Sequence, residues 1–483
     1  MSLSLEQKYA VARFQSGQNI FVTGPGGTGK TRLIRYFTDI LNEQGKKYQV
    51  CALTGCAAIL LGCKAKTIHS WSGIRLAKGR AEDIAERIIK NRITVKAWKN
   101  VEVLIVDEIS MLSARVFEVL DHIGQKVRKD RRPFGGIQVI FTGDFFQLPP
   151  IPDYGEETRF CFQSPRWPAV FAQENCIQLT TAFRQSDALY VSILNEIRQG
   201  RISPENEIVL RNQMNKEKDA DILPAKLFPV RQKVEFVNST TYAALEGEER
   251  NYEFTSRSTE VAYLETSKPI PAEVIQACRL LSKEEKAAEI DRILSHSQME
   301  KVVSLKVGAS VMCTTNIDVT GGICNGSQGI VVGFDTITKY PLVRFSNMRG
   351  RVIPIEPQTR QSEDYPIISV SQIPLTLAWA LTIHKIQGAT LDMAEMDIGK
   401  SVFEYGQTYV ALSRIRSLKG LYITDFRPDK IRANPDVVAF YREIENPSVS
   451  EMESYLIRTP VRPPSPLTIP IQKDPNIKTI RVR

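Results

Sequence analysis

The residues most clearly suited to chemistry form a stretch at positions 24–31 that reads Gly-Pro-Gly-Gly-Thr-Gly-Lys-Thr. This spacing is that of a P-loop, a glycine-rich turn whose backbone N–H groups surround the phosphates of a nucleotide. We expect Lys30 to reach the β- and γ-phosphates and Thr31 to place its hydroxyl on Mg²⁺. The residues that would cradle ATP are Gly24, Pro25, Gly26, Gly27, Thr28, Gly29, Lys30 and Thr31.

Two adjacent carboxylates are the second group of candidates. Asp107 and Glu108 directly follow an apolar run at 103–106, which is typical of a buried strand that ends in polar residues. Beside a P-loop, Asp107 is expected to hold Mg²⁺ through its hydration shell, and Glu108 to take a proton from the attacking water. The pair therefore indicates hydrolysis rather than phosphoryl transfer to a small acceptor.

A glutamine is the third candidate. Gln147 lies in the stretch 143–150, Gly-Asp-Phe-Phe-Gln-Leu-Pro-Pro, shortly after an apolar run at 137–141. A side-chain amide both donates and accepts, so it can bond to a γ-phosphate and to a water at once. We expect Gln147 to report whether ATP is intact.

These residues need a scaffold in which several strands end at the same edge of a sheet. Apolar runs predict strands at 19–23, 48–53, 101–106 and 137–141, and helical periodicity follows Lys30 and recurs around 116–127. Strands that alternate with helices and lack internal polar alternation predict an α/β fold with a parallel sheet covered on both faces. A segment at 75–98, rich in arginine and lysine, interrupts this alternation of strands and helices, and we expect it to be a small excursion from the core.

The pattern changes after about residue 180. A capping box predicts a helix that begins after Ser282, and short β-like runs at 307–355 predict a compact antiparallel element. From residue 446 onward seven prolines occur in 38 residues, so we expect an extended tail. Such a tail either stays solvated or binds a protein partner in polyproline II form.

The composition bounds the class of protein. The 483 residues carry 42% hydrophobic and 24% charged side chains, which is globular, and suggest about three domains. The net charge of +9 permits a polyanionic partner without requiring one. The eight cysteines form no C-x-x-C pair and the four histidines do not join them at zinc spacings, so we expect reduced thiols and no structural metal. The sequence shows no membrane span, signal peptide or mitochondrial presequence, which predicts a soluble intracellular protein.

Further motifs resemble those of the PIF-one (petite integration frequency) family of DNA helicases in superfamily 1B. The resemblance covers roughly residues 5–440, and its motifs occur in the family's order. Besides the three stretches above, they lie at 54–58, 67–73, 110–111, 132–138, 183–185, 325–329, 372–375, 378–380, 383–388 and 409–414.

The resemblance implies two RecA-like P-loop NTPase domains with ATP bound between them. It places the first at 1–178, with the excursion at 75–98 as a strand-separating wedge near Arg75, Lys78 and Arg80. It places the second at 179–243 and 374–445, an inserted domain with a Src-homology-3-like (SH3-like) β-barrel at 244–373, and the proline-rich tail at 446–483.

The matching motifs also imply roles for particular residues. Gln7 would read the adenine edge, Gly388 would contact the nucleotide, and Arg184 and Arg414 would enter the site from the second domain as arginine fingers. The residues that would contact DNA are Thr54, His69, Ser70, Thr382, His384 and Lys385. Either histidine also fits a structural role in the core or at a hinge.

The function implied is that of a monomeric, ATP- and Mg²⁺-dependent DNA helicase. It would move 5′ to 3′ on single-stranded DNA and unwind forked duplexes, and several relatives also unwind G-quadruplexes or DNA–RNA hybrids. The main alternative is a DNA-stimulated translocase that removes proteins or hybrids. A binding module with an inactive nucleotide site and a P-loop kinase are further rivals. Intact Lys30, Asp107, Glu108, Arg184 and Arg414 argue against an inactive site.

Overall fold

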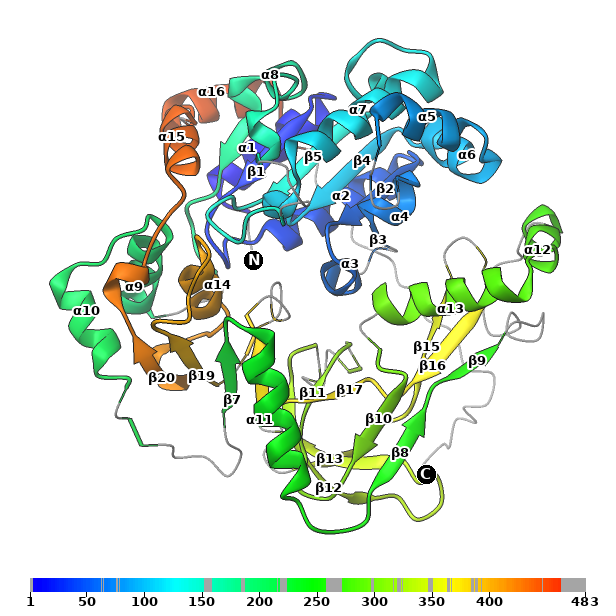
Figure 1. Cartoon of the computed structure of the whole chain (residues 1–483). Coiled ribbons are helices and arrows are strands. Elements are labelled where there is room, and N and C mark those ends of the chain that lie inside the picture. The colour runs from blue at the N-terminus through cyan, green and yellow to red at the C-terminus, as the bar shows by residue number, and fades with distance from the viewer. Residues whose placement is uncertain are drawn as a thin grey trace, which may run out of the picture.

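The computed structural model of the chain has two α/β lobes and a β-rich region beside the second lobe (Figure 1). The predicted α/β class is confirmed. The structure describes residues 3–61, 63, 65–74, 77, 79–151, 159–183, 187–214, 216–217, 224–257, 272–296, 299–315, 317–318, 323, 325–345, 351–362, 365, 367–383, 386, 390–391, 393–444 and 446–461.

The first lobe is built on a six-stranded parallel sheet with the order β3-β2-β4-β5-β1-β6. Its strands are β1 (Ile20–Thr23), β2 (Tyr48–Ala52), β3 (Lys66–Thr67), β4 (Val103–Asp107), β5 (Gln138–Gly143) and β6 (Cys176–Gln178). Every residue of β1 and β4 is buried, which explains the absence of polar alternation in the sequence.

Two apolar clusters cover the two faces of this sheet. Phe21 of β1 belongs to one cluster, whereas its neighbours Ile20 and Val22 belong to the other, because successive side chains on a strand point to opposite faces. Helix α7 packs on the face of Phe21, and α1 and α2 pack on the opposite face. The helices of this lobe are α1 (Leu5–Gln15), α2 (Lys30–Glu43), α3 (Gly55–Leu61), α4 (Ile68–Ser72), α5 (Ala81–Ile89), α6 (Arg92–Asn100), α7 (Ala114–Arg128) and α8 (Trp167–Val170).

The second lobe holds a four-stranded parallel sheet with the order β18-β7-β19-β20. Its strands are β7 (Ala225–Phe228), β18 (Ala380–Thr382), β19 (Ala394–Ile398) and β20 (Leu421–Phe426). Its helices are α9 (Ala188–Arg198), α10 (Pro204–Arg211), α11 (Arg231–Ala243) and α14 (Gln407–Ser413). The chain leaves this sheet after β7 and returns to it at β18.

The β-rich region occupies the interval between β7 and β18. Its largest sheet is antiparallel with the order β14-β13-β12-β11-β17, which confirms the antiparallel element predicted at 307–355. The strands are β8 (Arg250–Glu253), β9 (Thr255–Arg257), β10 (Val302–Leu305), β11 (Ser310–Cys313), β12 (Gln328–Phe334), β13 (Pro341–Phe345), β14 (Val352–Pro354), β15 (Gln358–Gln361), β16 (Ser369–Gln372) and β17 (Leu375–Leu377). The helices are α12 (Ala272–Arg279) and α13 (Lys283–His296). Ser282 caps α13 through reciprocal bonds with Glu285, as predicted.

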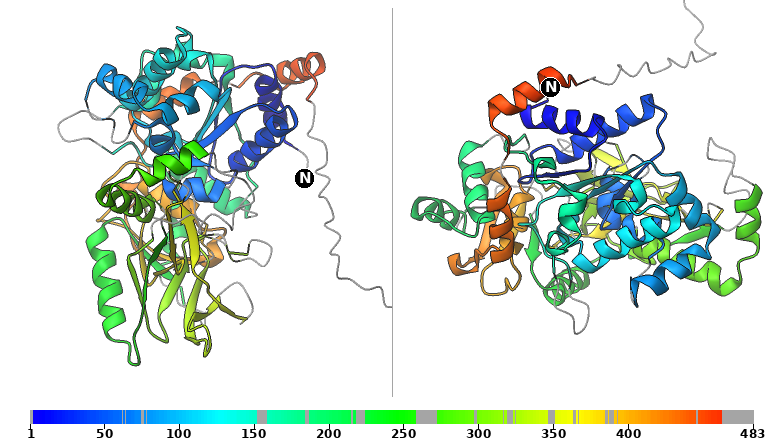
Figure 2. Two further views of the ribbon diagram at one scale, coloured as in Figure 1. Left: turned by 90° about the vertical axis from the view of Figure 1, so that its right-hand side faces the viewer. Right: turned by 90° about the horizontal axis from the view of Figure 1, so that it is seen from above.

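The end of the described chain returns to the first lobe. Helix α15 (Pro435–Glu443) places Phe440 against the rings of Phe21, Phe145 and Trp167. Helix α16 (Val449–Arg458) then lies along α1, as the view from above shows (Figure 2).

The prediction of an extended tail from residue 446 onward is wrong for this helix. Pro447 precedes α16 and Pro460 follows it, so the prolines bracket the helix instead of breaking it. Ser448 caps its first turn, with Glu451 completing a capping box. The remainder of the tail, 462–483, lies outside the described residues.

Candidate functional site

The P-loop forms the turn between β1 and α2, as the sequence predicts. Residues 24–29 connect the last residue of the buried strand to Lys30, the first residue of the helix. Gly29 has a φ of 86°, and a Cβ at this position would lie 2.8 Å from Nε2 of Gln7. Glycine is required here because a side chain would be strained and would collide with that amide. The turn therefore presents its backbone N–H groups at the start of α2, where an anion is favoured.

Lys30 turns back onto the loop that carries it. Its Nζ donates hydrogen bonds to the carbonyl oxygens of Gly24, at 2.6 Å, and Pro25, at 3.0 Å. Burial lowers the pKa of Lys30, while the nearby carboxylates of Asp144, Glu108 and Asp107 raise it. The ammonium group is thus buried against the turn that would hold the phosphates, where three carboxylates favour its charged form.

Asp107 and Glu108 lie where the sequence predicts, at the end of β4. The hydroxyl of Thr142 on β5 and the backbone N–H of Glu108 both donate to Oδ1 of Asp107. Burial and the neighbouring Glu108 raise the pKa of Asp107 to about 6. Glu108 adopts a left-handed backbone conformation, with a φ of 56°, and its buried Oε2 has no hydrogen-bond partner in the described part of the chain. A buried carboxylate oxygen without a donor is costly, so this oxygen is suited to meet a water or a ligand.

Gln147 follows β5 in the same cleft. It is buried, its backbone N–H bonds to the carbonyl of Asp144, and its side-chain Oε1 also lacks a partner in the described structure. The P-loop follows β1, Asp107 ends β4, and Gln147 lies shortly after β5. Strand β5 lies between β1 and β4 in the sheet. Their carboxyl ends therefore meet at one edge, which is where parallel α/β sheets bind ligands.

Arg414 approaches from the second lobe, at the C-terminal end of α14. The side chain is 2% exposed, and its guanidinium donates to the hydroxyl of Ser413 and the carbonyl of Val410. Burial lowers the pKa of Arg414, and the carboxylate of Glu108 opposes this shift. In the described part of the chain its guanidinium bonds to a hydroxyl and a carbonyl oxygen, and a buried guanidinium without a carboxylate partner is suited to receive an anion.

Helix α14 can approach the first lobe this closely because it begins with a glycine. Gly406 has a φ of 70°, and a Cβ there would lie 2.3 Å from the carbonyl oxygen of Phe146 and 2.8 Å from that of Gln147. The start of α14 therefore abuts the backbone of the stretch that carries Gln147. This contact fixes the distance between the helix of Arg414 and the first sheet.

Asp144 joins the two lobes, and sequence reasoning did not assign it a role. Its carboxylate forms a buried ion pair with Arg198 of α9 and accepts hydrogen bonds from the hydroxyls of Tyr409 and Tyr441. The guanidinium of Arg198 lies over the rings of Phe146, at 4.4 Å, and Tyr441, at 5.0 Å. Asp144 lies in the same stretch as Gln147, 143–150. The sequence around Arg198, however, contains no motif that indicates Arg198 as the partner of Asp144.

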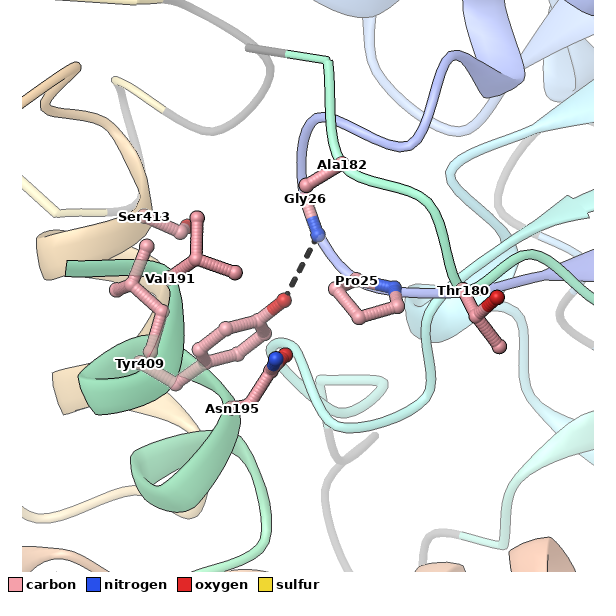
Figure 3. A pocket seen from close by; sticks show the side chains of 9 residues that line it. Pro25, Gly26, Thr180, Ala182, Val191, Asn195, Tyr409 and Ser413 are labelled. Atoms are coloured by element: carbon pink, nitrogen blue, oxygen red, sulfur yellow. Dashed lines mark hydrogen bonds between the residues drawn. The ribbon is translucent and has the colours of Figure 1, made fainter. Parts of the chain in front are cut away.

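Tyr409 also contacts the P-loop. Its hydroxyl accepts a hydrogen bond from the backbone N–H of Gly26, and both residues line a pocket between the lobes (Figure 3). Pro25, Thr180 and Asn195 also line this pocket. Burial, with Asp144 adding to it, raises the pKa of Tyr409, so the hydroxyl keeps the proton that it donates to Asp144.

Gln7 is buried beside the P-loop, but its amide bonds to protein groups in this structure. Nε2 donates to the carbonyl of Thr28 at 3.2 Å, and Oε1 accepts from the backbone N–H of Ser4 at 3.1 Å as part of the capping box of α1. Each amide atom can form one further bond. The expected contact with adenine therefore stays a prediction.

Two residues expected at the nucleotide lie outside the described part of the chain: Arg184 and Gly388. Phe183, which precedes Arg184, donates its backbone N–H to the carbonyl of Gly27 at 2.8 Å. The segment that leads to Arg184 therefore crosses the P-loop.

The first-lobe residues expected to contact DNA lie at the same edge of the sheet, beyond the nucleotide site. Thr54 follows β2, His69 and Ser70 follow β3, and these two strands are paired at the end of the sheet opposite β6. Thr54 caps α3 by accepting from the N–H of Ala57, and all three candidates are half-buried. The strand order thus separates the two groups: the residues expected to bind the nucleotide lie at the ends of β1, β4 and β5, and those expected to contact DNA follow β2 and β3.

Ser70 is also contacted from the β-rich region. The guanidinium of Arg292 on α13 donates to the hydroxyl of Ser70 at 3.2 Å and forms an ion pair with Glu289. Helix α13 therefore reaches the first lobe next to a residue expected to bind DNA. Sequence reasoning offered no signal for this contact.

The second-lobe candidates are described only in part. Thr382 is half-buried at the end of β18, an edge strand of the second sheet, whereas His384 and Lys385 lie outside the described residues. The expected wedge contains the helices α5 and α6, of which α5 packs against α7. Arg75 and Lys78 are not described, and Arg80 forms an exposed ion pair with Asp83 at the start of α5.

The donors present fit a magnesium nucleotide better than a protein-only metal centre. Mg²⁺ is usually held by one or two carboxylates together with waters and substrate phosphates. Asp107 and the exposed Thr31, beside the unsatisfied oxygen of Glu108, fit that pattern. In the part of the chain that the structure describes, three or more Asp, Glu, His or Cys side chains do not gather in a cluster able to hold a metal. Within the same residues, no helix has both the length and the apolar character that a membrane span needs.

Two models of protein families match parts of the chain. The model described as "PIF1-like helicase" matches residues 2–208, and the model described as "DNA helicase Pif1, 2B domain" matches residues 290–334. The curated "ATP-dependent DNA helicase PIF1" of Danio rerio is 36% identical over 449 residues, which cover 92% of this chain and 64% of the relative. The chain therefore spans somewhat less than two thirds of that relative's length.

Two solved structures are similar over most of the chain. The Pif1 helicase from Candida albicans has a TM-score of 0.71 and 32% identity, covering 92% of this chain and all of that one. The Pif1 helicase from Bacteroides in complex with ADP-AlF3 and ssDNA has a TM-score of 0.60 and 27% identity, covering 92% of this chain and 97% of that one.

Proposed function

Because this chain belongs to the PIF1-like helicase family, we propose that it is an ATP-dependent DNA helicase that moves 5′ to 3′ on single-stranded DNA and unwinds duplex DNA. The observation that carries the proposal is the pocket in which Pro25 and Gly26 of the P-loop face Tyr409 and Ser413 of α14, next to Arg414. The Bacteroides relative, solved with a nucleotide analogue and single-stranded DNA, supports both ligands.

Each side chain in the cleft has a part in ATP hydrolysis. Lys30 would exchange its bonds to the carbonyls of Gly24 and Pro25 for phosphate oxygens. Glu108 would orient the attacking water and take its proton, and Gln147 would bond to the water and the terminal phosphate. Arg414 would stabilise the charge that develops on that phosphate.

Asp107 and Thr31 would hold Mg²⁺, and Thr31 is suited to this because it lies in the first turn of α2, beside the loop. When bound, Mg²⁺ supplies positive charge that neutralises phosphate oxygens. We also propose, from the matching motifs, that Arg184 is a second arginine finger, that Gln7 reads adenine and that Gly388 contacts the nucleotide.

Hydrolysis drives movement because the cleft contains groups from both lobes. Arg414 acts only when the lobes are together, so each turnover is linked to closure. Thr54, His69 and Ser70 on one lobe and Thr382, His384 and Lys385 on the other would hold the DNA backbone by contacts that ignore sequence. Alternate closing and opening would then advance a single strand, and a forked duplex would be separated at the entrance.

We further propose that the lobes and the β-rich region are the domains expected from the sequence. The RecA-like domains would occupy 1–178 and 179–243 with 374–445, and the antiparallel sheet of β11–β14 and β17 would form the SH3-like barrel within 244–373. We expect a monomer, since both described halves of the nucleotide site come from one chain.

The rate of ATP hydrolysis with and without single-stranded DNA tests the proposal. Single-stranded DNA should raise the rate of ATP hydrolysis steeply in the presence of Mg²⁺, because a translocating enzyme couples hydrolysis to bound DNA. The variant Lys30→Ala should abolish hydrolysis while the fold, measured by circular dichroism, is retained. A rate of ATP hydrolysis that does not depend on DNA would contradict the proposed helicase function. Transfer of phosphate to a small acceptor would indicate a kinase.

A further inference from the structure

Tyr409 joins the second lobe to two separate groups of the first. Its hydroxyl accepts a hydrogen bond from the backbone N–H of Gly26 at 2.9 Å (Figure 3). It also donates one to Oδ2 of Asp144 at 3.1 Å. Gly26 belongs to the P-loop and Asp144 follows β5, whereas Tyr409 lies on α14. One phenolic oxygen therefore connects the phosphate-binding turn, the stretch that carries Gln147 and the helix that carries Arg414.

Gly26 lies in the P-loop, whose backbone N–H groups cradle phosphates, and its N–H is occupied by Tyr409 in this structure. A phosphate oxygen carries charge, and hydrogen bonds to charged acceptors are stronger than bonds to a neutral phenol. Phosphate would therefore replace the hydroxyl of Tyr409 at this donor. Lys30 shows the same pattern, because its ammonium bonds to carbonyl oxygens of the loop.

We propose that Tyr409 is a positioning residue whose hydroxyl occupies the Gly26 N–H until a nucleotide phosphate replaces it. The proposal rests on the function proposed above and deepens it, since it names the residue through which the second lobe senses the phosphate site. The exchange ties the arrival of nucleotide to the position of α14 and hence of Arg414.

The surroundings of Asp144 explain how Tyr409 stays in place after the exchange. Asp144 is held by the ion pair with Arg198 and by the hydroxyl of Tyr441, so it remains fixed when the Gly26 bond is lost. Tyr409 then keeps its bond to Asp144. Helix α14 is then released from the P-loop but stays attached to the first lobe through Asp144.

A purely structural role for Tyr409 makes a different prediction. If the hydroxyl only anchors α14, its removal lowers stability and leaves nucleotide affinity unchanged or weaker. If it competes with phosphate, its removal tightens binding, because the N–H of Gly26 is then left without an acceptor until the nucleotide arrives. The expected gain is about two- to tenfold, the size of one net hydrogen bond.

The matched control is Tyr190→Phe. Tyr190 is a fully buried tyrosine of α9 whose hydroxyl donates to the carbonyl of Leu412 on the same helix α14, at 2.7 Å. Each variant removes one buried tyrosine hydroxyl that bonds at α14, but the hydroxyl of Tyr190 bonds within the second lobe and not to the P-loop.

The test measures the dissociation constant of a non-hydrolysable ATP analogue with Mg²⁺ for the full chain, in the absence of DNA. We expect Tyr409→Phe to bind two- to tenfold more tightly than the wild-type chain, and Tyr190→Phe to bind no more tightly. Equal or weaker binding by Tyr409→Phe overturns the inference while leaving the proposed function intact. A wild-type chain that does not bind the analogue overturns both.

A second measurement does not depend on the folding of a variant. Fluorine NMR of 3-fluorotyrosine at position 409, which keeps the hydroxyl, should show a shifted resonance when the analogue is added. The same label at position 190 should show little change. A resonance at position 409 that does not respond to saturating analogue would contradict the exchange.

Discussion

Asp144, just beyond β5, and Arg198, at the end of α9, form an ion pair with an N–O distance of 2.9 Å, and their side chains are 0% and 5% exposed. The pair joins the two lobes beside the proposed nucleotide site. Two tyrosine hydroxyls complete the hydrogen bonding of the carboxylate, so the buried charge is well compensated.

Replacing Arg198 with methionine should destabilise the protein strongly. The change leaves the carboxylate of Asp144 buried without its cation, and removing one partner of a buried pair costs about 3 kcal/mol or more. We expect a clearly lower midpoint of urea unfolding. Arg211→Met is the control, because Arg211 pairs with Glu207 at the surface of α10 and such pairs contribute under about 1 kcal/mol. Equal midpoints for the two variants would contradict the importance assigned to the buried pair.

Arg414→Ala should reduce turnover and spare nucleotide binding. The guanidinium is held at the end of α14 by Ser413, which lines the pocket between the lobes, and arginine fingers raise the rate of hydrolysis by about 10³–10⁵. The DNA-stimulated ATPase rate and the affinity for an ATP analogue separate the two effects. Arg416→Ala, which alters an exposed arginine two residues further on, should keep most of the activity. A large loss of analogue binding in Arg414→Ala would indicate a structural role instead.

Glu108→Gln tests the proton acceptor. The variant keeps the size of the side chain but removes the basic oxygen, and loss of a general base typically costs 10²–10⁴ in rate. We expect hydrolysis to fall by about this amount while the ATP analogue and single-stranded DNA still bind. Near-normal hydrolysis would remove Glu108 from the proposed chemistry.

Met452→Ala should loosen the contact between α16 and α1. Met452 is buried in the apolar cluster that includes Tyr9 and Val11, and such truncations cost about 2–5 kcal/mol. We expect faster amide hydrogen exchange in α16 and in α1. Ile457→Ala is the control, because Ile457 is 82% exposed on the same helix. If both variants exchanged like the wild-type chain, α16 would not be stabilised by this packing.

The first lobe could be predicted from the sequence because its signals are local. The glycine spacing at 24–31, the buried strands and the carboxylates after β4 each lie within a few neighbouring residues. A parallel sheet then brings the ends of β1, β4 and β5 together without further information. The meeting of Lys30, Asp107, Glu108 and Gln147 follows from these facts alone.

The contacts between lobes could not be predicted in the same way. Asp144 and Arg198 are 54 residues apart, and Gly26 and Tyr409 are 383 residues apart, so neither pair leaves a local pattern. The helix α16 was missed for another reason. A high proline content indicates an extended chain, but the ten residues of α16, between Pro447 and Pro460, contain no proline and are helical.

The most direct test of the helicase uses duplexes that carry a single-stranded tail on either the 5′ or the 3′ side, with ATP and Mg²⁺. We expect strand separation from the 5′ tail only, and its loss in Lys30→Ala. ATP hydrolysis on both tails without separation would favour the translocase. Equal unwinding from the 3′ tail, or unwinding that persists in Lys30→Ala, would contradict the central claim.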